Sequence, residues 1–213
     1  MLLRDFSNLE ERWYRLLVIS PVDSNGIPAF YPNELEYCDG TRIWGGDDHQ
    51  LSIPLNTGWT LETNLYYENS PIEDVLLTVQ PSSGFLRGGW SDENGSIWIG
   101  GIPTENIIVA LESNELPDQW LSNERWTYDS GEAESMEVSS NIEMEVEDPL
   151  IGIQVSGLVH QGSQPIPDAV VTVYSNSQLR SSTTNEDGIY TVEGLPSGEV
   201  LAWMSAEGYA NTY

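Results

Sequence analysis

Apolar and polar residues alternate in short runs along the last third of the chain. A period of two sends successive side chains to opposite faces of an extended backbone, so each run predicts a half-buried β-strand. Turn residues separate the runs, first in Asn185–Gly188 and then in Gly194–Gly198. Single residues separate the apolar members of each run, which are Ala169, Val171 and Val173; Tyr190 and Val192; and Val200, Ala202 and Met204.

The stretch PIPDAVVTV at Pro165–Val173 has a counterpart, PIEDVLLTV, at Pro71–Val79. The offset is 94 residues, and five of the nine positions are identical. Beyond a loop near Gly84, where one residue is lost, the offset becomes 93 for the pairs Leu86–Arg87 and Leu179–Arg180, Gly95 and Gly188, Gly101 and Gly194, and Pro103 and Pro196. Turn residues and strand patterns in the same order over about fifty positions predict a duplicated unit.

Short strands separated by turns every 8–12 residues or so are typical of an antiparallel β-sandwich. We therefore expect an all-β protein with tandem transthyretin-like or immunoglobulin-like sandwiches over residues 56–148 and 149–213. Residues 1–55 are harder to interpret. They are mainly β by pattern and could hold a partial earlier copy. A short helix could be marked by Leu2, Leu3, Phe6, Leu9 and Trp13, whereas WYRLLVI could be a strand.

The first copy continues into SMEVSSNIEMEVE, which alternates like one or two further strands, and the second copy has no equivalent. We therefore expect the second sandwich to be truncated at its C-terminus and the chain to be a piece of a longer protein. The acidic residues within 131–148 suit either a disordered linker or an edge strand with outward glutamates. The alternation favours the strand, because outward charge also blocks edge pairing.

The second copy resembles the carboxypeptidase regulatory-like domain. The pattern consists of DG-x-Y at Asp187–Tyr190, GLP-x-G at Gly194–Gly198 and GY at Gly208–Tyr209. The resemblance covers about residues 153–213, and a weaker one covers about 60–148. It implies a transthyretin-like, carbohydrate-binding-like β-sandwich that serves as a non-catalytic accessory module of a larger extracellular or cell-surface protein. The residues expected to shape the turns are Gly95, Gly101 and Pro103 in the first copy, and Asp187, Gly188, Gly194, Pro196 and Gly198 in the second.

The charge balance narrows the choice of partners. Seven basic residues stand against thirty-four acidic ones, which gives a net charge of −27, and lysine is absent. Nucleic acids and anionic membrane surfaces both need a positive footprint, so neither is an expected partner. The apolar run LLVI is too short to span a bilayer. The single cysteine, Cys38, cannot form an internal disulfide and does not indicate a compartment.

The sequence lacks the residue spacings of common catalytic sites. His49 and His160 lie far apart in the sequence and outside any zinc-ligand spacing, and there is no GxSxG motif. Without lysine there is no P-loop and no Schiff base. We therefore expect no enzymatic activity and no cofactor. Asp and Asn in the turns are hard oxygen ligands that could hold Ca²⁺, but they are also the ordinary residues of hairpin turns, which is the favoured interpretation.

Two tryptophans are candidates for ligand contact. If Ile97 and Ile99 point inward, Trp98 points outward, and the same parity sends Trp203 outward from its strand. Exposed aromatic side chains often mark contact surfaces. Trp98 and Trp203 could therefore stack on a polysaccharide, or they could pack against a neighbouring domain, which is the favoured interpretation.

The sequence thus predicts non-catalytic sandwich modules that space, present or dock other domains of the same protein or other surface proteins. One alternative is a carbohydrate-binding module that uses Trp98 or Trp203. Another is the accessory region of a secreted enzyme, for example a peptidase, whose catalytic domain lies elsewhere. The extracellular assignment rests on the family resemblance alone, so a cytosolic acidic protein stays open.

Overall fold

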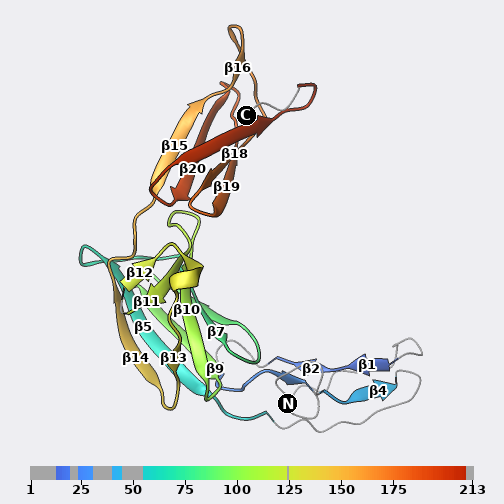
Figure 1. Ribbon diagram of the computed structural model, residues 1–213, viewed down its shortest axis with the longest axis vertical. Helices are drawn as coiled ribbons and strands as arrows, with labels where there is room; N and C mark the ends of the chain where they lie inside the picture. The colour runs from blue at the N-terminus through green and yellow to red at the C-terminus, as the bar shows by residue number, and fades with distance from the viewer. Residues whose placement is uncertain (1–12, 20–23, 31–39, 45–54, 124, 210–213) are drawn as a thin grey trace.

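The computed structural model describes residues 13–19, 24–30, 40–44, 55–123 and 125–209. Their regular elements are β-strands, with one 3-10 turn at Ser130–Glu132 (η1) and no α-helix. The all-β class predicted by the alternation is confirmed. Figure 1 shows two strand-rich units, one beyond the end of the other, joined by a single connection.

The first unit comprises β5 to β14. One sheet has the order β12-β11-β10-β7-β8, with β13 also paired to β10, and the other has the order β14-β5-β6, with β9 also paired to β5. The strands are β5 (Trp59–Tyr67), β6 (Ser70–Pro71), β7 (Leu76–Pro81), β8 (Arg87–Trp90), β9 (Ser96–Ile102), β10 (Asn106–Glu112), β11 (Gln119–Ser122), β12 (Arg125–Thr127), β13 (Met136–Glu137) and β14 (Ile142–Glu147).

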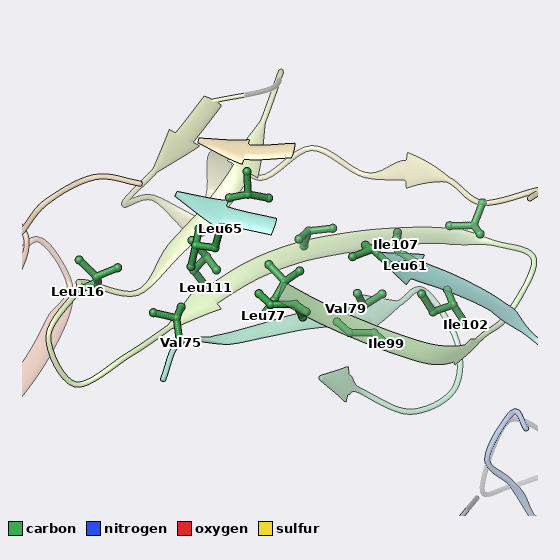
Figure 2. Close-up of a cluster of buried hydrophobic side chains, with 14 residues drawn as sticks. Leu61, Leu65, Val75, Leu77, Val79, Ile99, Ile102, Ile107, Leu111 and Leu116 are labelled. Carbon is green, nitrogen blue, oxygen red and sulfur yellow. The ribbon is translucent and has the colours of Figure 1, made fainter. Parts of the chain in front are cut away.

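The alternate residues of these strands form the first core (Figure 2). Leu61 and Leu65 of β5 face Leu77 and Val79 of β7, and all four are fully buried. Burying an aliphatic side chain of this size contributes about 1.5–3 kcal/mol relative to leaving it exposed. The period-two pattern of the sequence thus places one apolar face of each sheet against the other.

The second unit comprises β15 to β21. Its sheets are β19-β18-β21 and β15-β20, with a short hairpin of β16 and β17. The strands are β15 (Ile153–Leu158), β16 (His160–Gln161), β17 (Gln164–Pro165), β18 (Val170–Ser175), β19 (Gln178–Thr183), β20 (Ile189–Leu195) and β21 (Val200–Ser205). A separate core contains Ala169, Val171, Val173, Val192 and Leu195. The three strands predicted from alternation are present as β18, β20 and β21.

Equivalent residues of the two units have equivalent partners on the neighbouring strands. In the first unit, Val79 of β7 lies opposite Val109 of β10, and Leu76 lies opposite Trp90 of β8. In the second unit, the residues at the predicted offsets pair in the same way: Val173 with Ala202, and Val170 with Thr183. The ladder between β5 and β9 shifts register after Trp59, and the ladder between β15 and β20 shifts after Ile153, 94 residues later.

The tight turns of the two units also correspond. The Oδ1 atom of Asp92 accepts hydrogen bonds from the backbone N–H groups of Asn94 and Ser96, at 2.8 and 2.9 Å. The Oδ1 atom of Asn185 accepts the equivalent bonds from Asp187 and Ile189, at 3.0 and 2.9 Å. These oxygens therefore hold the hairpin turns themselves, as Asx turns do.

Glycine is required where each turn approaches the backbone from earlier in its unit, at Leu65 of β5 and at Val159 between β15 and β16. Gly95 and Gly188 have φ of +74° and +72°, in the left-handed region. A Cβ atom at Gly188 would lie 2.5 Å from the carbonyl oxygen of Val159, and one at Gly95 would collide with the equivalent oxygen of Leu65. Both the backbone conformation and the close approach exclude a side chain there.

Two glycines that we predicted to shape turns lie within strands instead. Gly101 is part of β9 and Gly194 is part of β20, each next to the register shift of its ladder and each with positive φ, +74° and +67°. An extra residue in one strand, with glycine in the left-handed region, forms a β-bulge. These positions are therefore bulges inside strands rather than turns between them.

The acidic segment that follows β12 is structured. β13 pairs with β10 antiparallel, whereas β14 runs parallel to β5 and is an edge strand of its sheet. Ile142 and Val146 face the core, and Glu143 and Glu145 point outward. The edge-strand interpretation of the acidic segment is confirmed over Ile142–Glu147. The parallel pair is an exception to the antiparallel pattern that we expected.

Among the described residues nearer the N-terminus, there are four short strands. β1 (Trp13–Arg15) pairs with β4 (Arg42–Trp44), and β2 (Leu17–Val18) pairs with β3 (Ala29–Phe30). WYRLLVI is thus largely extended, as the strand interpretation predicted. The rings of Trp13 and Trp44 meet edge to face, with centroids 5.5 Å apart. Most of the helix alternative lies outside the described residues, as do Cys38 and His49.

Candidate functional site

The two units meet in a joint that is held by polar contacts. Gln178, at the start of β19, accepts a hydrogen bond from the backbone N–H of Asp118 at 2.9 Å and donates one to the carbonyl of the same residue at 2.6 Å. Both bonds join the second unit to the loop before β11 of the first. Gln178 is buried, so its amide is satisfied by this one backbone position.

Arg180 adds the only ion pair among the described residues that links the units. Its guanidinium lies 2.6 Å from Oδ1 of Asp118 and also donates to the carbonyl of Ser113 at 3.2 Å. Both partners are about a quarter to a third exposed, so solvent screens the attraction. The pair therefore fixes orientation more than it adds stability.

The connecting segment is clamped by the first unit. Gln119 is fully buried, and its side chain accepts from the N–H of Leu150 at 2.7 Å and donates to the carbonyl of the same residue at 2.9 Å. The hydroxyl of Tyr128 donates to the carbonyl of Ile151 at 3.1 Å. Burial raises the pKa of Tyr128, and this effect outweighs the opposing one of its hydrogen bond with Ser197 of the second unit.

The bulge glycine of β20 completes the joint. A Cβ atom at Gly194 would lie 2.8 Å from the carbonyl oxygen of Asn114, so the loop of the first unit touches its backbone directly. In the connecting segment, a Cβ at Gly152 would lie 3.0 Å from the ring of Pro117. Glycine at both places lets the two backbones approach closely.

The equivalent bulge of the first unit also receives a preceding loop. A Cβ at Gly101 would collide with the carbonyl oxygen of Gly26, and Gly26 forms a β-bridge with Thr57. Arg87 occupies the register position of Arg180 and donates from Nε to the carbonyl of Gly100 at 2.8 Å. Arg87 is buried, and desolvation lowers its pKa. The bulge glycine of each unit thus faces the chain that precedes the unit, whereas the bond of Arg87 stays within the first unit.

A second candidate site is an open hollow of about 970 Å³ on the outer face of β14, β5 and β9. Trp98 of β9 lines it together with Trp90 at the end of β8, and Glu62, Glu143 and Glu145 contribute carboxylates. Trp98 lies opposite Glu62, which in turn lies opposite Glu143. Ile97 and Ile99 are buried, so the parity that sends Trp98 outward is present.

Trp203 lies apart from this hollow. It is half-buried on β21, opposite Thr172, whose hydroxyl shares a hydrogen bond of 2.9 Å with Ser181. The two tryptophans singled out from the sequence therefore belong to different units and do not form one surface. Trp90, the neighbour of Trp98, could not be placed from the sequence because no alternating run surrounds it.

The remaining predicted positions are backbone features. The carbonyl of Pro103 accepts from the N–H of Glu105 at 3.0 Å, and that of Pro196 accepts from the hydroxyl of Ser175 at 2.9 Å. Asp187 is exposed and only its backbone is engaged in the turn. Gly198 has φ of +146° and open space around it. None of these four residues lines the hollow beside Trp98.

One apolar strip of the second unit is uncovered. Val109 of β10 is 1% exposed, because β11, β13 and β14 complete the first unit around it. Its register equivalent, Ala202 of β21, is exposed, and Val200 is 38% exposed. Among the residues from 125 to 209, only β18 pairs with β21.

Within the described ranges, no group of three or more His, Cys, Asp or Glu side chains is arranged to hold a metal ion. The same ranges contain no helix long and apolar enough to cross a membrane.

A family comparison covers most of the second unit. The family model of the carboxypeptidase regulatory-like domain matches residues 154–213. This confirms the resemblance inferred from DG-x-Y, GLP-x-G and GY. No curated protein matches the chain in sequence.

Similar solved structures include the TIE protein of Bacillus anthracis, at 14% identity, with a TM-score of 0.31 over 94% of this chain and 37% of that one. A streptococcal ancillary pilin is 12% identical, with a TM-score of 0.34 over 92% and 66%. The minor pilin GBS52 of Streptococcus agalactiae is 12% identical, with a TM-score of 0.34 over 73% and 89%. The chain thus spans about a third of the TIE protein and about two thirds of the ancillary pilin.

Proposed function

We propose that the chain is a non-catalytic spacer segment of a larger extracellular or cell-surface protein. In this proposal, residues 56–148 and 149–213 are tandem sandwich domains, the first a diverged copy of the second. The shared register and the shared turn and bulge glycines support the duplication. The family matched at residues 154–213 supports the proposed outside location.

The observation that carries the proposal is the joint between the units. A flexible tether would leave the backbone between domains solvated, whereas here Gln119 clamps Leu150 and Gln178 pairs with Asp118. Such contacts resist bending, because breaking them leaves buried polar groups unpaired. A fixed angle between successive domains is what a spacer needs in order to hold another domain at a defined distance.

The equivalent contact at the other end of the first unit supports the same role. Gly101 meets Gly26 in the way that Gly194 meets Asn114, so the bulge glycine of each unit receives the chain that precedes it. Partners would then be the neighbouring domains of the same protein, attached in series. An accessory role beside an enzyme, for example a peptidase domain, is compatible with this geometry and would use the same rigidity.

Spin labels at equivalent turn positions test rigidity directly. Cysteines introduced at Glu93 and Glu186, in a Cys38→Ser background, place one label in each of the two corresponding turns. We expect a narrow distribution of label distances by pulsed electron resonance. Gln178→Ala combined with Arg180→Ala should broaden it. Gln154→Ala is the matched control, because its side chain bonds only Glu193 within the second unit.

A broad distribution in the parent protein would reject the spacer. Staining of intact source cells with an antibody against residues 149–213 tests the location separately, and staining only after permeabilisation would reject the extracellular assignment.

A further inference from the structure

We propose that the outer hollow of the first unit binds an extended basic peptide segment of a partner protein, with the indole of Trp98 and the carboxylates of Glu143 and Glu145 as its main contacts. This inference goes beyond the spacer role and does not depend on the joint. It concerns the hollow of about 970 Å³ on β14, β5 and β9.

Two tryptophan side chains form the aromatic part of the site, and both are accessible to solvent. Trp90 is 62% exposed at the end of β8, and Trp98 is half-buried with its ring over Gly100. Both line the hollow, and neighbouring apolar surface of this kind marks contact sites more often than an isolated exposed residue does. An indole face also attracts a cation placed within about 6 Å of its centre.

The charges around the aromatic surface all have one sign. Glu62, Glu143 and Glu145 are exposed and line the hollow, and they have no hydrogen-bond or ion-pair partner within the described part of the chain. None of the described residues that line the hollow is basic. Asp92 also lines it, but its carboxylate already holds the hairpin turn.

The strand register places two of these charges against each other. Glu143 and Glu62 are direct partners on neighbouring strands, which run about 4.8 Å apart. Like charges in opposite positions destabilise a sheet. A bound cation removes this repulsion, whereas a neutral sugar leaves it in place. Charge complementarity therefore favours a basic partner over a polysaccharide on the same surface.

The spacing of the carboxylates favours an extended segment. Glu143 and Glu145 are two residues apart on one face of β14, so their spacing matches alternate residues of another extended chain. A peptide with basic side chains at alternate positions can thus meet both, and a further basic side chain can reach Trp98 across Glu62.

The test uses a terminally blocked heptapeptide that alternates Lys and Thr, titrated into the full chain with tryptophan fluorescence as the signal. We expect saturable binding that weakens as salt is added. The double variant Glu143→Gln/Glu145→Gln should bind about tenfold more weakly. Trp98→Ala should also weaken binding, and Trp203→Ala should not.

The decisive control separates the hollow from the overall charge of −27. Glu186→Gln/Glu207→Gln changes two exposed carboxylates of the second unit and lowers the net charge equally. We expect it to bind as the parent does, and an equal loss in both double variants overturns the proposal. Melting temperatures check that each variant is folded. Glu143→Gln should not lower the melting temperature, because the substitution removes the repulsion with Glu62.

Two further results also overturn the proposal. One is binding of a neutral β-glucan oligosaccharide that depends on Trp98 but not on Glu143, without peptide binding. The other is saturable binding of calcium chloride that Glu143→Gln abolishes, again without peptide binding. None of these substitutions touches Gln178 or Arg180, so the label distances of the joint should be unchanged whichever result is found.

Discussion

Gly95 and Gly188 occupy the same place in their units, because a Cβ at either position would meet a carbonyl oxygen from earlier in the same unit, that of Leu65 in β5 or that of Val159 between β15 and β16. The same oxygens also accept backbone bonds, from Ile72 and from Ile166. The oxygen cannot retreat from an added side chain without breaking that bond. The constraint is therefore steric as well as conformational.

Gly188→Ala should destabilise the second unit by about 3 kcal/mol or more, because the new Cβ lies 2.5 Å from Val159 O and the φ of +72° is also unfavourable. Gly162→Ala is the matched control. Its φ is +62° but nothing lies within 4 Å, so it should cost only about 1–2 kcal/mol. Urea unfolding measures both changes. Equal losses would show that backbone conformation alone explains the glycine.

Asn185→Ala should cost about 1–2 kcal/mol, because two backbone N–H groups lose the Oδ1 atom that accepts from them. Asn185→Asp keeps an oxygen at that position, as Asp92 does in the first unit, and should cost much less. Hydrogen exchange at the amides of Asp187 and Ile189 reports the turn directly. If exchange there is as slow in Asn185→Ala as in the parent, the turn does not depend on the side chain.

Tyr128 makes the joint sensitive to alkaline pH. Burial raises its pKa above the ordinary value of about 10, so the folded protein keeps a proton that the unfolded chain loses. The stabilising contribution is therefore fully present below about pH 10 and is lost as pH rises through the higher folded value.

We expect Tyr128→Phe to lower the free energy of unfolding by about 0.5–1.5 kcal/mol at pH 8, through loss of the bond to Ile151. The difference from the parent should shrink between pH 9 and 11, as measured by urea unfolding at several pH values. The remaining tyrosines are common to both proteins and cancel in the comparison. A difference that stays constant across this range would contradict the assignment to Tyr128.

Local pattern was enough to predict the strands that alternate strictly. β18 and β20 carry β-branched or aromatic residues on one face, and their turns contain Asn, Asp and Gly. β19 was missed, because QLRSST has no apolar inward face and Leu179 is 55% exposed. Its existence follows from pairing with β18 over six residues, which is tertiary context that no local period records.

The joint was also beyond local pattern. Gln178 and Asp118 lie sixty residues apart in the chain and look like ordinary surface residues until the units are placed together. One signal did exist, since the repeat aligns Arg180 with Arg87 in a chain that has few basic residues. Gly101 and Gly194 were identified as structural glycines, but their positions in bulges depend on the register of a whole ladder.

Val109 and Ala202 test whether equivalent positions have equivalent surroundings. Both lie opposite a buried valine of the central strand, yet Val109 is 1% exposed and Ala202 is exposed at the edge of its sheet. Val109→Asp should therefore cost about 3–5 kcal/mol, because it buries an unpaired carboxylate, whereas Ala202→Asp should change stability by less than about 0.5 kcal/mol. Urea unfolding of the two variants, followed by hydrogen exchange in each unit, measures the change in the free energy of unfolding of that unit. A large loss in Ala202→Asp would mean that another strand covers β21 in solution, and sedimentation of the parent would then show whether a second copy supplies it.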